Sequence, residues 1–268
     1  MVKLLFGDCK DKLKEIDSNS IDLILTSPPY ANQRKNTYGG VYPDRYVEWF
    51  KPISDELYRV LKHTGTFILN IKENVIEGQR SLYVMKLVIS MVDNNWIFTE
   101  EFIWHKKNSF CGKWPNRFRD SWEHLYQFNK NKKFNMFQEF VMQDACESTK
   151  NRLKNINNKN DVKNLESNSN SGLKRNMFSC VNRDKVYPTN VIHCSTSTKN
   201  KNHPASFPEY IPEFFIKLFT EKNNVVLDPF AGSGTTIKIA NKLNRNCIGI
   251  ELNQEYYKMI DDYFKMRI

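Results

Sequence analysis

The sequence predicts an α/β fold with a doubly wound, mostly parallel sheet and an irregular, basic insert. Short apolar runs alternate with segments of helical periodicity near both ends of the chain, as strands and helices do in such a sheet. A Gly-rich turn follows one of the later apolar runs, at the position where doubly wound folds bind ligands. Between the two regular parts lies a stretch rich in Asn, Lys and Ser without apolar periodicity.

The first regular part covers residues 1–129. Its expected strands, each a short apolar or aromatic run, cover residues 2–6, 21–25, 66–71, 96–106 and 121–130. Its expected helices cover residues 9–17, 44–64 and 81–93. Pro52 should kink or break the second helix, and Gly65 should end it. The third helix is expected to be amphipathic, through Leu82, Met85, Val88, Ile89 and Val92.

The irregular part covers residues 130–200, and its composition predicts loops or partial disorder. From residue 130 to residue 201 the chain carries 14 Lys and Arg against 6 Asp and Glu, so most of its net charge of +10 lies there. Such a charge favours a polyanionic partner. A solvated loop without a binding role is the alternative.

The last regular part covers residues 201–268. A helix is expected to start near residue 203, with Ile211, Phe214, Phe215 and Leu218 on its apolar face. The elements expected after it are a strand at 224–230, a Gly-rich turn, a helix at 235–243, a strand at 247–252 and a closing helix at 255–264.

The composition also bears on location and metals. No stretch approaches 18 consecutive apolar residues and the N-terminus turns polar too early for a signal peptide, so we expect a cytoplasmic protein that does not contact membranes. The six cysteines are scattered without a C-x-x-C pair, which indicates neither disulfides nor a metal site.

The Gly-rich turn, V-V-L-D-P-F-A-G-S-G-T-T at 225–236, is typical of a nucleoside site. Gly232 and Gly234 permit close backbone approach, and Glu251 follows Asp228 by 23 positions, about where such sites place an acid on ribose hydroxyls. The turn is neither a P-loop nor G-x-G-x-x-G. S-adenosylmethionine has a sulfonium and an amino acid end but no pyrophosphate, so it matches a carboxylate at Asp228 better. A plain tight turn is the alternative.

A second turn, Ser27-Pro28-Pro29-Tyr30, follows the strand at 21–25. Because prolines fix φ and lack N–H groups, this turn presents acceptors without competing backbone donors. The Ser27 hydroxyl and the Pro28 carbonyl suit an exocyclic amino group on a nucleobase, and Tyr30 offers a flat face to a base flipped out of a duplex. A rigid corner with Tyr30 as packing is the alternative.

These two motifs resemble those of the DNA amino-methyltransferases, which methylate N4 of cytosine or N6 of adenine. The catalytic signature [DNS]-P-P-[YFW] matches residues 27–30, and a variant of the cofactor signature D-P-F-x-G-x-G-T matches residues 228–235. The catalytic motif comes first, which is similar to the order of the beta class. Further matches are Gly7-Asp8, His203-Pro204-Ala205, Phe207-Pro208 and Glu251.

The resemblance implies S-adenosylmethionine as cofactor on a Rossmann-like methyltransferase sheet, direct transfer without a covalent intermediate, and Ser27, Pro28, Pro29 and Tyr30 as catalytic residues. The cofactor residues that it implies are Asp8, His203, Pro204, Ala205, Phe207, Asp228, Pro229, Phe230, Gly232, Ser233, Gly234, Thr235 and Glu251. Residues 1–129 would be the catalytic half, 201–268 the cofactor half and 130–200 the target-recognition region.

The expected partners are duplex DNA and a cognate restriction endonuclease, with the protein acting as a monomer or homodimer. Within this family Ser27 favours cytosine N4, with adenine N6 as the alternative; cytosine C5 is disfavoured because no Pro-Cys nucleophile motif is present. A methyltransferase for RNA or protein glutamine, and an inactive DNA-binding subunit, are the remaining alternatives.

Basic residues interleave with aromatic residues before the strand at 121–130, which favours contact with nucleic acid over an ordinary amphipathic loop. Together with two residues of the irregular part, the expected DNA-binding residues are Lys106, Lys107, Lys113, Arg117, Arg119, Lys174 and Arg175.

Overall fold

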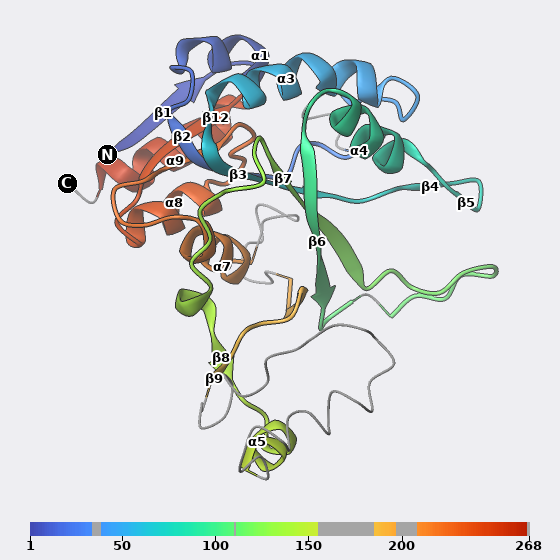
Figure 1. Cartoon of the computed structure of the whole chain (residues 1–268). Helices are drawn as coiled ribbons and strands as arrows, with labels where there is room; N and C mark the ends of the chain where they lie inside the picture. Colours follow the sequence, from blue (N-terminus) through green and yellow to red (C-terminus); the bar gives the residue numbers. More distant parts are fainter. Residues whose placement is uncertain (34–38, 110, 155–184, 197–207, 267–268) are drawn as a thin grey trace. The chain divides into compact units, whose positions relative to one another are not determined.

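The computed structural model describes residues 1–33, 39–109, 111–154, 185–196 and 208–266 (Figure 1). Two compact units are distinguished: one comprises Met1–Phe137 with Asn190–Ile268, the other Gln138–Thr189. The sequence-based division of the chain placed the irregular part at 130–200, so residues at both ends of that part belong to the first unit.

The first unit is built on an eight-stranded sheet in the order β1-β12-β11-β2-β3-β7-β6-β10. Of these strands β7 alone runs antiparallel to its neighbours, β3 and β6, so the predicted doubly wound, mostly parallel sheet is confirmed. In sheet order the strands are β1 (Val2–Phe6), β12 (Asn246–Glu251), β11 (Val225–Asp228), β2 (Ile21–Thr26), β3 (Leu61–Ile71), β7 (Trp122–Asn129), β6 (Ile97–Lys106) and β10 (Val191–Cys194).

The two ends of the chain meet at the centre of this sheet. Strand β2 is buried along its whole length, as its apolar run predicts, and it pairs in parallel with β11 through Leu23 and Val226. From this pair the chain continues to β3 on one side and to β12 on the other. The order of the strands therefore reverses between β2 and β11, and ligands bind beyond the carboxyl ends of strands at such a point.

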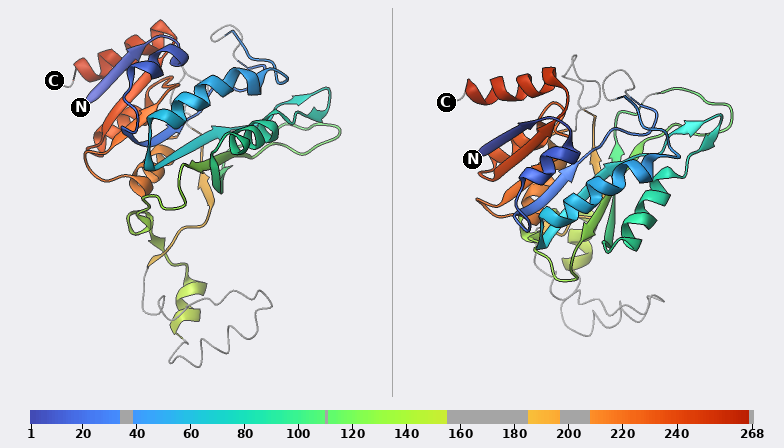
Figure 2. Two further views of the ribbon diagram at one scale, coloured as in Figure 1. Left: turned by 45° about the horizontal axis from the view of Figure 1, so that its top comes forward. Right: turned by 90° about the horizontal axis from the view of Figure 1, so that it is seen from above.

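Helices cover both faces of the sheet (Figures 1 and 2). One face carries α1 (Cys9–Lys12), which continues as the 3₁₀ turn η1 (Leu13–Glu15), with α3 (Tyr46–Val60) and α4 (Tyr83–Asp93). The other carries α7 (Tyr210–Phe219), α8 (Thr235–Lys242) and α9 (Gln254–Lys265). A hairpin of β4 (Val75–Ile76) and β5 (Gln79–Arg80) extends beyond β3.

One prediction about α3 was wrong. The helix is continuous through Pro52, so the proline does not break it, and residues on both sides of the proline, among them Phe50, Ile53 and Leu57, are buried in the core. Gly65 does not end the helix but lies inside β3. A side chain at Gly65 would come within 2.9 Å of the Asp22 carbonyl oxygen on β2, so this glycine allows the two strands to approach closely.

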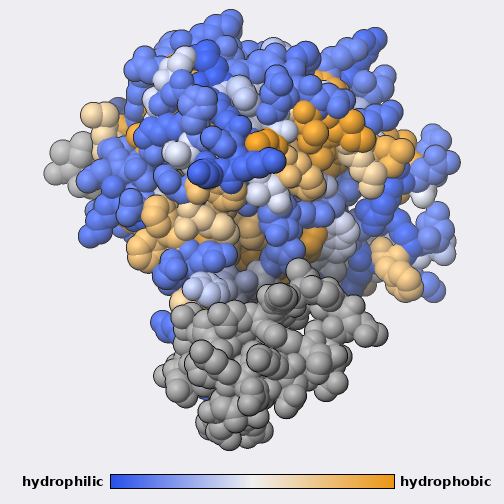
Figure 3. Space-filling view, in the orientation of Figure 1, coloured by the Kyte–Doolittle hydropathy of each residue, from blue (hydrophilic) through white to orange (hydrophobic). Residues whose placement is uncertain are grey.

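The prediction of which side of α4 is buried was also wrong. The residues that the helix buries in the core are Tyr83, Val84, Leu87 and Met91. Four of the predicted residues remain exposed, Leu82 (55%), Met85 (54%), Ile89 (61%) and Val92 (44%), and hydrophobic surface is visible around α4 in Figure 3. Because apolar residues lie on both sides of this helix, its periodicity did not determine which side would be buried.

Part of the irregular segment is ordered into short elements. In the second unit β8 (Gln143–Asp144) pairs with β9 (Lys185–Val186), beside the 3₁₀ turn η2 (Gln138–Val141) and helix α5 (Glu147–Lys154). Strand β10 belongs to the first unit and extends the main sheet by pairing with β6. The prediction of loops was therefore wrong for β10, whose run of only four residues has no alternating pattern to identify it.

Candidate functional site

The two predicted motifs line one cavity of about 700 Å³ at the carboxyl ends of β2 and β11. The catalytic motif contributes Ser27, Pro28, Pro29 and Tyr30 to it. The predicted cofactor residues in its lining are Asp8, Asp228, Pro229, Phe230, Gly232, Ser233, Thr235 and Glu251. The fold thus brings together residues that are some 200 positions apart in sequence.

A hydrogen bond joins the two halves at the floor of this site. The Thr26 hydroxyl, at the end of β2, donates to Asp228 Oδ1 at the end of β11 over 2.7 Å, and the Phe230 N–H donates to the same oxygen over 3.1 Å. Burial raises the pKa of Asp228 to about 6, and the hydrogen bonds from Thr26 and the Phe230 N–H oppose this rise.

The Gly-rich turn is held in place by the Glu251 side chain at the end of β12. Gly232 and Gly234 have φ values of +53° and +78°, which glycine adopts at little cost, and Gly234 is the N-cap of α8. The Gly232 N–H donates to Glu251 Oε2 over 2.7 Å, and the Asn253 N–H donates to Glu251 Oε1 over 2.7 Å. Glu251 therefore holds the turn after β11 to the turn after β12, at the side of the cavity.

Aromatic rings form another part of the wall. The rings of Trp49 on α3 and Phe230 lie 6.0 Å apart between centroids. Asp8 begins α1, where its side chain accepts from the Lys10 N–H over 2.9 Å. The wall thus combines flat apolar surface with carboxylates at Asp8, Asp228 and Glu251.

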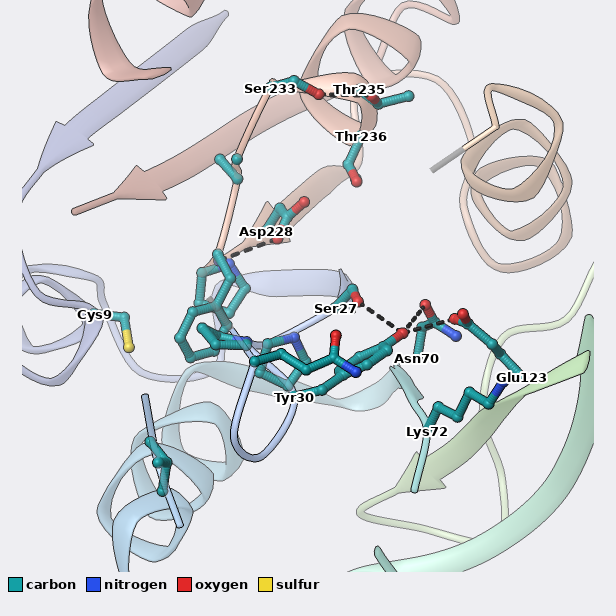
Figure 4. Close-up of a pocket in the computed structure, with 18 of the residues that line it drawn as sticks. Cys9, Ser27, Tyr30, Asn70, Lys72, Glu123, Asp228, Ser233, Thr235 and Thr236 are labelled. Carbon is teal, nitrogen blue, oxygen red and sulfur yellow. Dashed lines mark hydrogen bonds between the residues drawn. The ribbon is translucent and has the colours of Figure 1, made fainter. Parts of the chain in front are cut away.

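The Ser-Pro-Pro-Tyr turn is fixed by hydrogen bonds at Pro29 and Tyr30. The Tyr46 hydroxyl on α3 donates to the Pro29 carbonyl over 2.8 Å. The Tyr30 hydroxyl lies 2.7 Å from Glu123 Oε2, 3.0 Å from Asn70 Oδ1 and 3.3 Å from Ser27 Oγ (Figure 4). Burial raises the pKa of Tyr30 well above its ordinary value, and the charge of Glu123 adds to the effect, so this phenol keeps its hydrogen.

Charged groups fill the side of the cavity beyond Tyr30. Glu123, on β7, forms an ion pair with Lys106 on β6. Asp120 forms ion pairs with Lys72 (3.5 Å), Arg80 (2.6 Å) and Arg117 (3.3 Å). Burial lowers the pKa of Lys72, which also lines the cavity.

The predicted DNA-binding residues separate into two groups. Lys106 and Arg117 are half-buried, line the cavity and take part in these ion pairs. Lys107, Lys113 and Arg119 are exposed. Lys174 and Arg175 lie outside the described residues, as do the predicted cofactor residues His203, Pro204, Ala205 and Phe207.

The lining residues that the sequence analysis missed include Trp49, Asn70, Lys72 and Glu123. Asn70 and Lys72 lie at the carboxyl end of the strand predicted at 66–71, so a search for polar residues at strand ends would have found them. Glu123 lies at the amino end of β7. That end reaches the same edge of the sheet because β7 is antiparallel to β3, which the sequence did not indicate.

The described residues contain no group of three or more His, Cys, Asp and Glu side chains arranged to hold a metal ion. No helix within these residues has both the length and the apolar character that crossing a membrane requires.

Comparison with known proteins gives a match over most of the chain. A family model described as DNA methylase matches residues 21–262. The chain is 29% identical to the type II methyltransferase M.PvuII of Proteus hauseri, covering 94% of this chain and 80% of that protein. It is also 29% identical to the DNA adenine methyltransferase YhdJ of Escherichia coli K12, covering 96% of this chain and 80% of that protein.

Solved structures agree with the fold. The PvuII DNA methyltransferase, described as cytosine-N4-specific, superposes with a TM-score of 0.73 at 26% identity, covering 98% of this chain and 86% of that one. A complex of M1.HpyAVI with S-adenosylmethionine superposes with a TM-score of 0.62 at 18% identity, covering 98% and 99% of the two chains, and supports the fold alone. With both signature motifs in one cavity and the family match over residues 21–262, this chain belongs to the N6/N4 DNA methylase family and is an S-adenosylmethionine-dependent DNA methyltransferase.

Proposed function

We propose that this enzyme methylates N4 of a flipped cytosine within a short sequence of duplex DNA. The observation that carries the proposal is the position of Ser27 and Pro28, the acceptors of the catalytic turn, in the same cavity as the Gly-rich turn. The similarity to a structure described as cytosine-N4-specific supports cytosine. The chain is 29% identical both to M.PvuII and to a DNA adenine methyltransferase, which makes adenine N6 the second candidate.

The residues of the cavity suit S-adenosylmethionine, which supplies an electrophilic methyl group on a sulfonium. The Asp228 carboxylate offers a counter-charge to a cationic ligand group. The Glu251 carboxylate accepts from two backbone N–H groups at the side of the cavity, and its oxygens are of the kind that accept from ribose hydroxyls. Trp49 and Phe230 provide apolar surface for an adenine ring. We assign these four residues, with Asp8, to the cofactor site.

The chain itself contributes positioning and electrostatics. An exocyclic amine is a weak nucleophile because its lone pair is delocalised into the ring. Acceptance of its two hydrogens by Ser27 Oγ and the Pro28 carbonyl would favour a pyramidal nitrogen with its lone pair directed at the methyl carbon. With the cofactor bound, the amine lone pair would form the new N–C bond while the electron pair of the S–C bond left with sulfur, and the methylated nitrogen would then release one proton.

Access to a base within a duplex requires base flipping. We assign Lys107, Lys113 and Arg119 to phosphate contacts, since they are exposed and Arg117, in the same segment, lines the cavity. We also propose a restriction-modification role with a cognate endonuclease, in the cytoplasm, because several similar proteins are type II methyltransferases.

The test is expression in a host that lacks DNA methylation, followed by genome sequencing with a method that distinguishes modified bases. N4-methylcytosine at one short sequence is expected. N6-methyladenine would establish the second candidate, and methyl transfer from labelled cofactor to RNA or protein only would contradict both. Ser27→Ala should retain cofactor binding and lose turnover, which separates the catalytic site from the cofactor site.

A further inference from the structure

The Tyr30 hydroxyl is the centre of a three-way contact at the base of the catalytic turn. Its oxygen lies 2.7 Å from Glu123 Oε2, 3.0 Å from Asn70 Oδ1 and 3.3 Å from Ser27 Oγ (Figure 4). A phenol has one hydrogen to donate and accepts through its lone pairs. Once one neighbour accepts that hydrogen, the other neighbours can only donate a hydrogen to the Tyr30 oxygen.

Two of the three neighbours present acceptors to Tyr30. Glu123 is only 7% exposed, its other oxygen, Oε1, contacts the Lys106 ammonium, and a carboxylate has no hydrogen to donate. The Asn70 amide is oriented by its own donor, because Nδ2 donates to the His124 carbonyl over 2.9 Å. Oδ1 is therefore the Asn70 atom that faces Tyr30.

These constraints give the hydrogen-bond chain a direction. The hydrogen of Tyr30 is directed to Glu123, which offers both the shorter distance and the charge-assisted bond. Among the three neighbours Ser27 alone has a hydrogen to give to the Tyr30 oxygen. The Ser27 hydrogen is therefore turned toward Tyr30, and both lone pairs of Ser27 Oγ remain for a ligand in the cavity.

We infer that Glu123 is a positioning residue for methyl transfer: acting through Tyr30, it holds the Ser27 hydroxyl as a hydrogen-bond acceptor for the target amine. The inference rests on the role of Ser27 given under the proposed function, and it applies to cytosine N4 and adenine N6 alike. A freely rotating Ser27 hydroxyl could instead donate to the amine lone pair and block its attack on the methyl carbon. Lys106 supports the arrangement by pairing with Glu123.

The experiment is a double-mutant cycle of Glu123→Gln and Tyr30→Phe, with kcat and KM measured for methyl transfer to duplex DNA. A glutamine side chain has nearly the same shape as the glutamate that it replaces, but it lacks the charge and can also donate, so the direction of the chain is no longer set. Either substitution alone should lower kcat roughly 10- to 100-fold, with KM for cofactor and DNA within about twofold of wild type. In the Tyr30→Phe background, Glu123→Gln should cause no further loss.

Glu213→Gln is the matched control, because Glu213 also pairs with a lysine, Lys217, but lies on α7 and does not line the cavity. Its kcat should equal that of wild type. Independent, multiplicative losses in the cycle, or a higher KM at unchanged kcat, would overturn the inference. If Glu123→Gln does not fold, Tyr30→Phe alone decides, since an unchanged kcat without the Tyr30 hydroxyl would also overturn the inference.

The methylated base is identified in the same assay. Methylation of adenine would contradict the cytosine proposal, but the mutant cycle would still test the role of Glu123.

Discussion

The Thr26 hydroxyl donates a 2.7 Å hydrogen bond to Asp228, a residue 202 positions later in the chain. Thr26 directly precedes the catalytic turn, and Asp228 begins the cofactor signature. Because both side chains are buried, this bond cannot be exchanged readily for one to water. It therefore fixes the distance between the two halves of the site.

Replacing Thr26 by Val should lower the free energy of unfolding by about 1–3 kcal/mol, because Asp228 loses a hydrogen bond that it accepts in a buried position. Denaturant unfolding at pH 7 measures the change. Thr26→Ser retains the hydroxyl and is the control. Unchanged stability in Thr26→Val, together with a loss in Thr26→Ser, would show that the methyl group, not the hydrogen bond, is what the fold requires.

The stability of the protein should fall as the pH rises from about 4 to about 6, through the contribution of Asp228. Its pKa is about 6 in the fold, against an ordinary value of 3.8, so between these values the folded chain binds more protons than the unfolded chain. Two pKa units correspond to about 3 kcal/mol of folding free energy at most.

The variant Asp228→Asn cannot titrate at this position. Between pH 4 and pH 7 its free energy of unfolding should therefore rise relative to that of wild type by up to about 3 kcal/mol, measured by unfolding at each pH. A constant difference would contradict the prediction.

Gly234→Ala should destabilise the protein more than Gly39→Ala does. Both glycines have a similar positive φ, +78° and +76°, so both substitutions carry the same backbone strain, about 1–2 kcal/mol. A Cβ at Gly234 would also lie 2.7 Å from Ile260 Cγ1, whereas a Cβ at Gly39 would meet no atom of the described residues within 4 Å. We expect a further loss of about 1–3 kcal/mol and weaker cofactor binding for Gly234→Ala, measured by thermal unfolding and calorimetric titration. Equal losses in stability would show that Ile260 moves away without cost.

The salt dependence of the DNA-binding constant should show whether Lys113 and Arg119 contact phosphates. If each contacts one phosphate, Lys113→Gln with Arg119→Gln should reduce the slope of log K against log salt by about 1.8. Fluorescence anisotropy with a duplex at several salt concentrations measures the slope. Lys222→Gln, an exposed lysine outside the cavity lining, is the control and should leave it unchanged. An unchanged slope in the double variant would remove these two residues from the DNA-binding surface.

Most strands and helices were predictable because their apolar periodicity is local. The strand predicted at 21–25 is β2, and the closing helix predicted at 255–264 is α9, each within two residues at either end. The differences came where packing outweighs local preference: α3 has no break at Pro52, and α4 buries Tyr83 and Leu87 while Met85 stays exposed. No local signal distinguishes two apolar sides of one helix.

By itself, the sequence determined which functional groups the site can use, namely those of the Ser-Pro-Pro-Tyr turn and of the Gly-rich turn with Asp228. It also determined an alternation of strands and helices that predicts a doubly wound sheet. Side-chain identity and short-range periodicity are encoded residue by residue, so these features could be read directly. The tertiary structure decided the rest, including the antiparallel direction of β7 and the resulting contact of Glu123 with Tyr30. This contact joins positions that are 93 residues apart. It depends on which strands pair and in which register. The pairing and the register are determined by burial of the whole sheet, and a local sequence pattern does not contain that information.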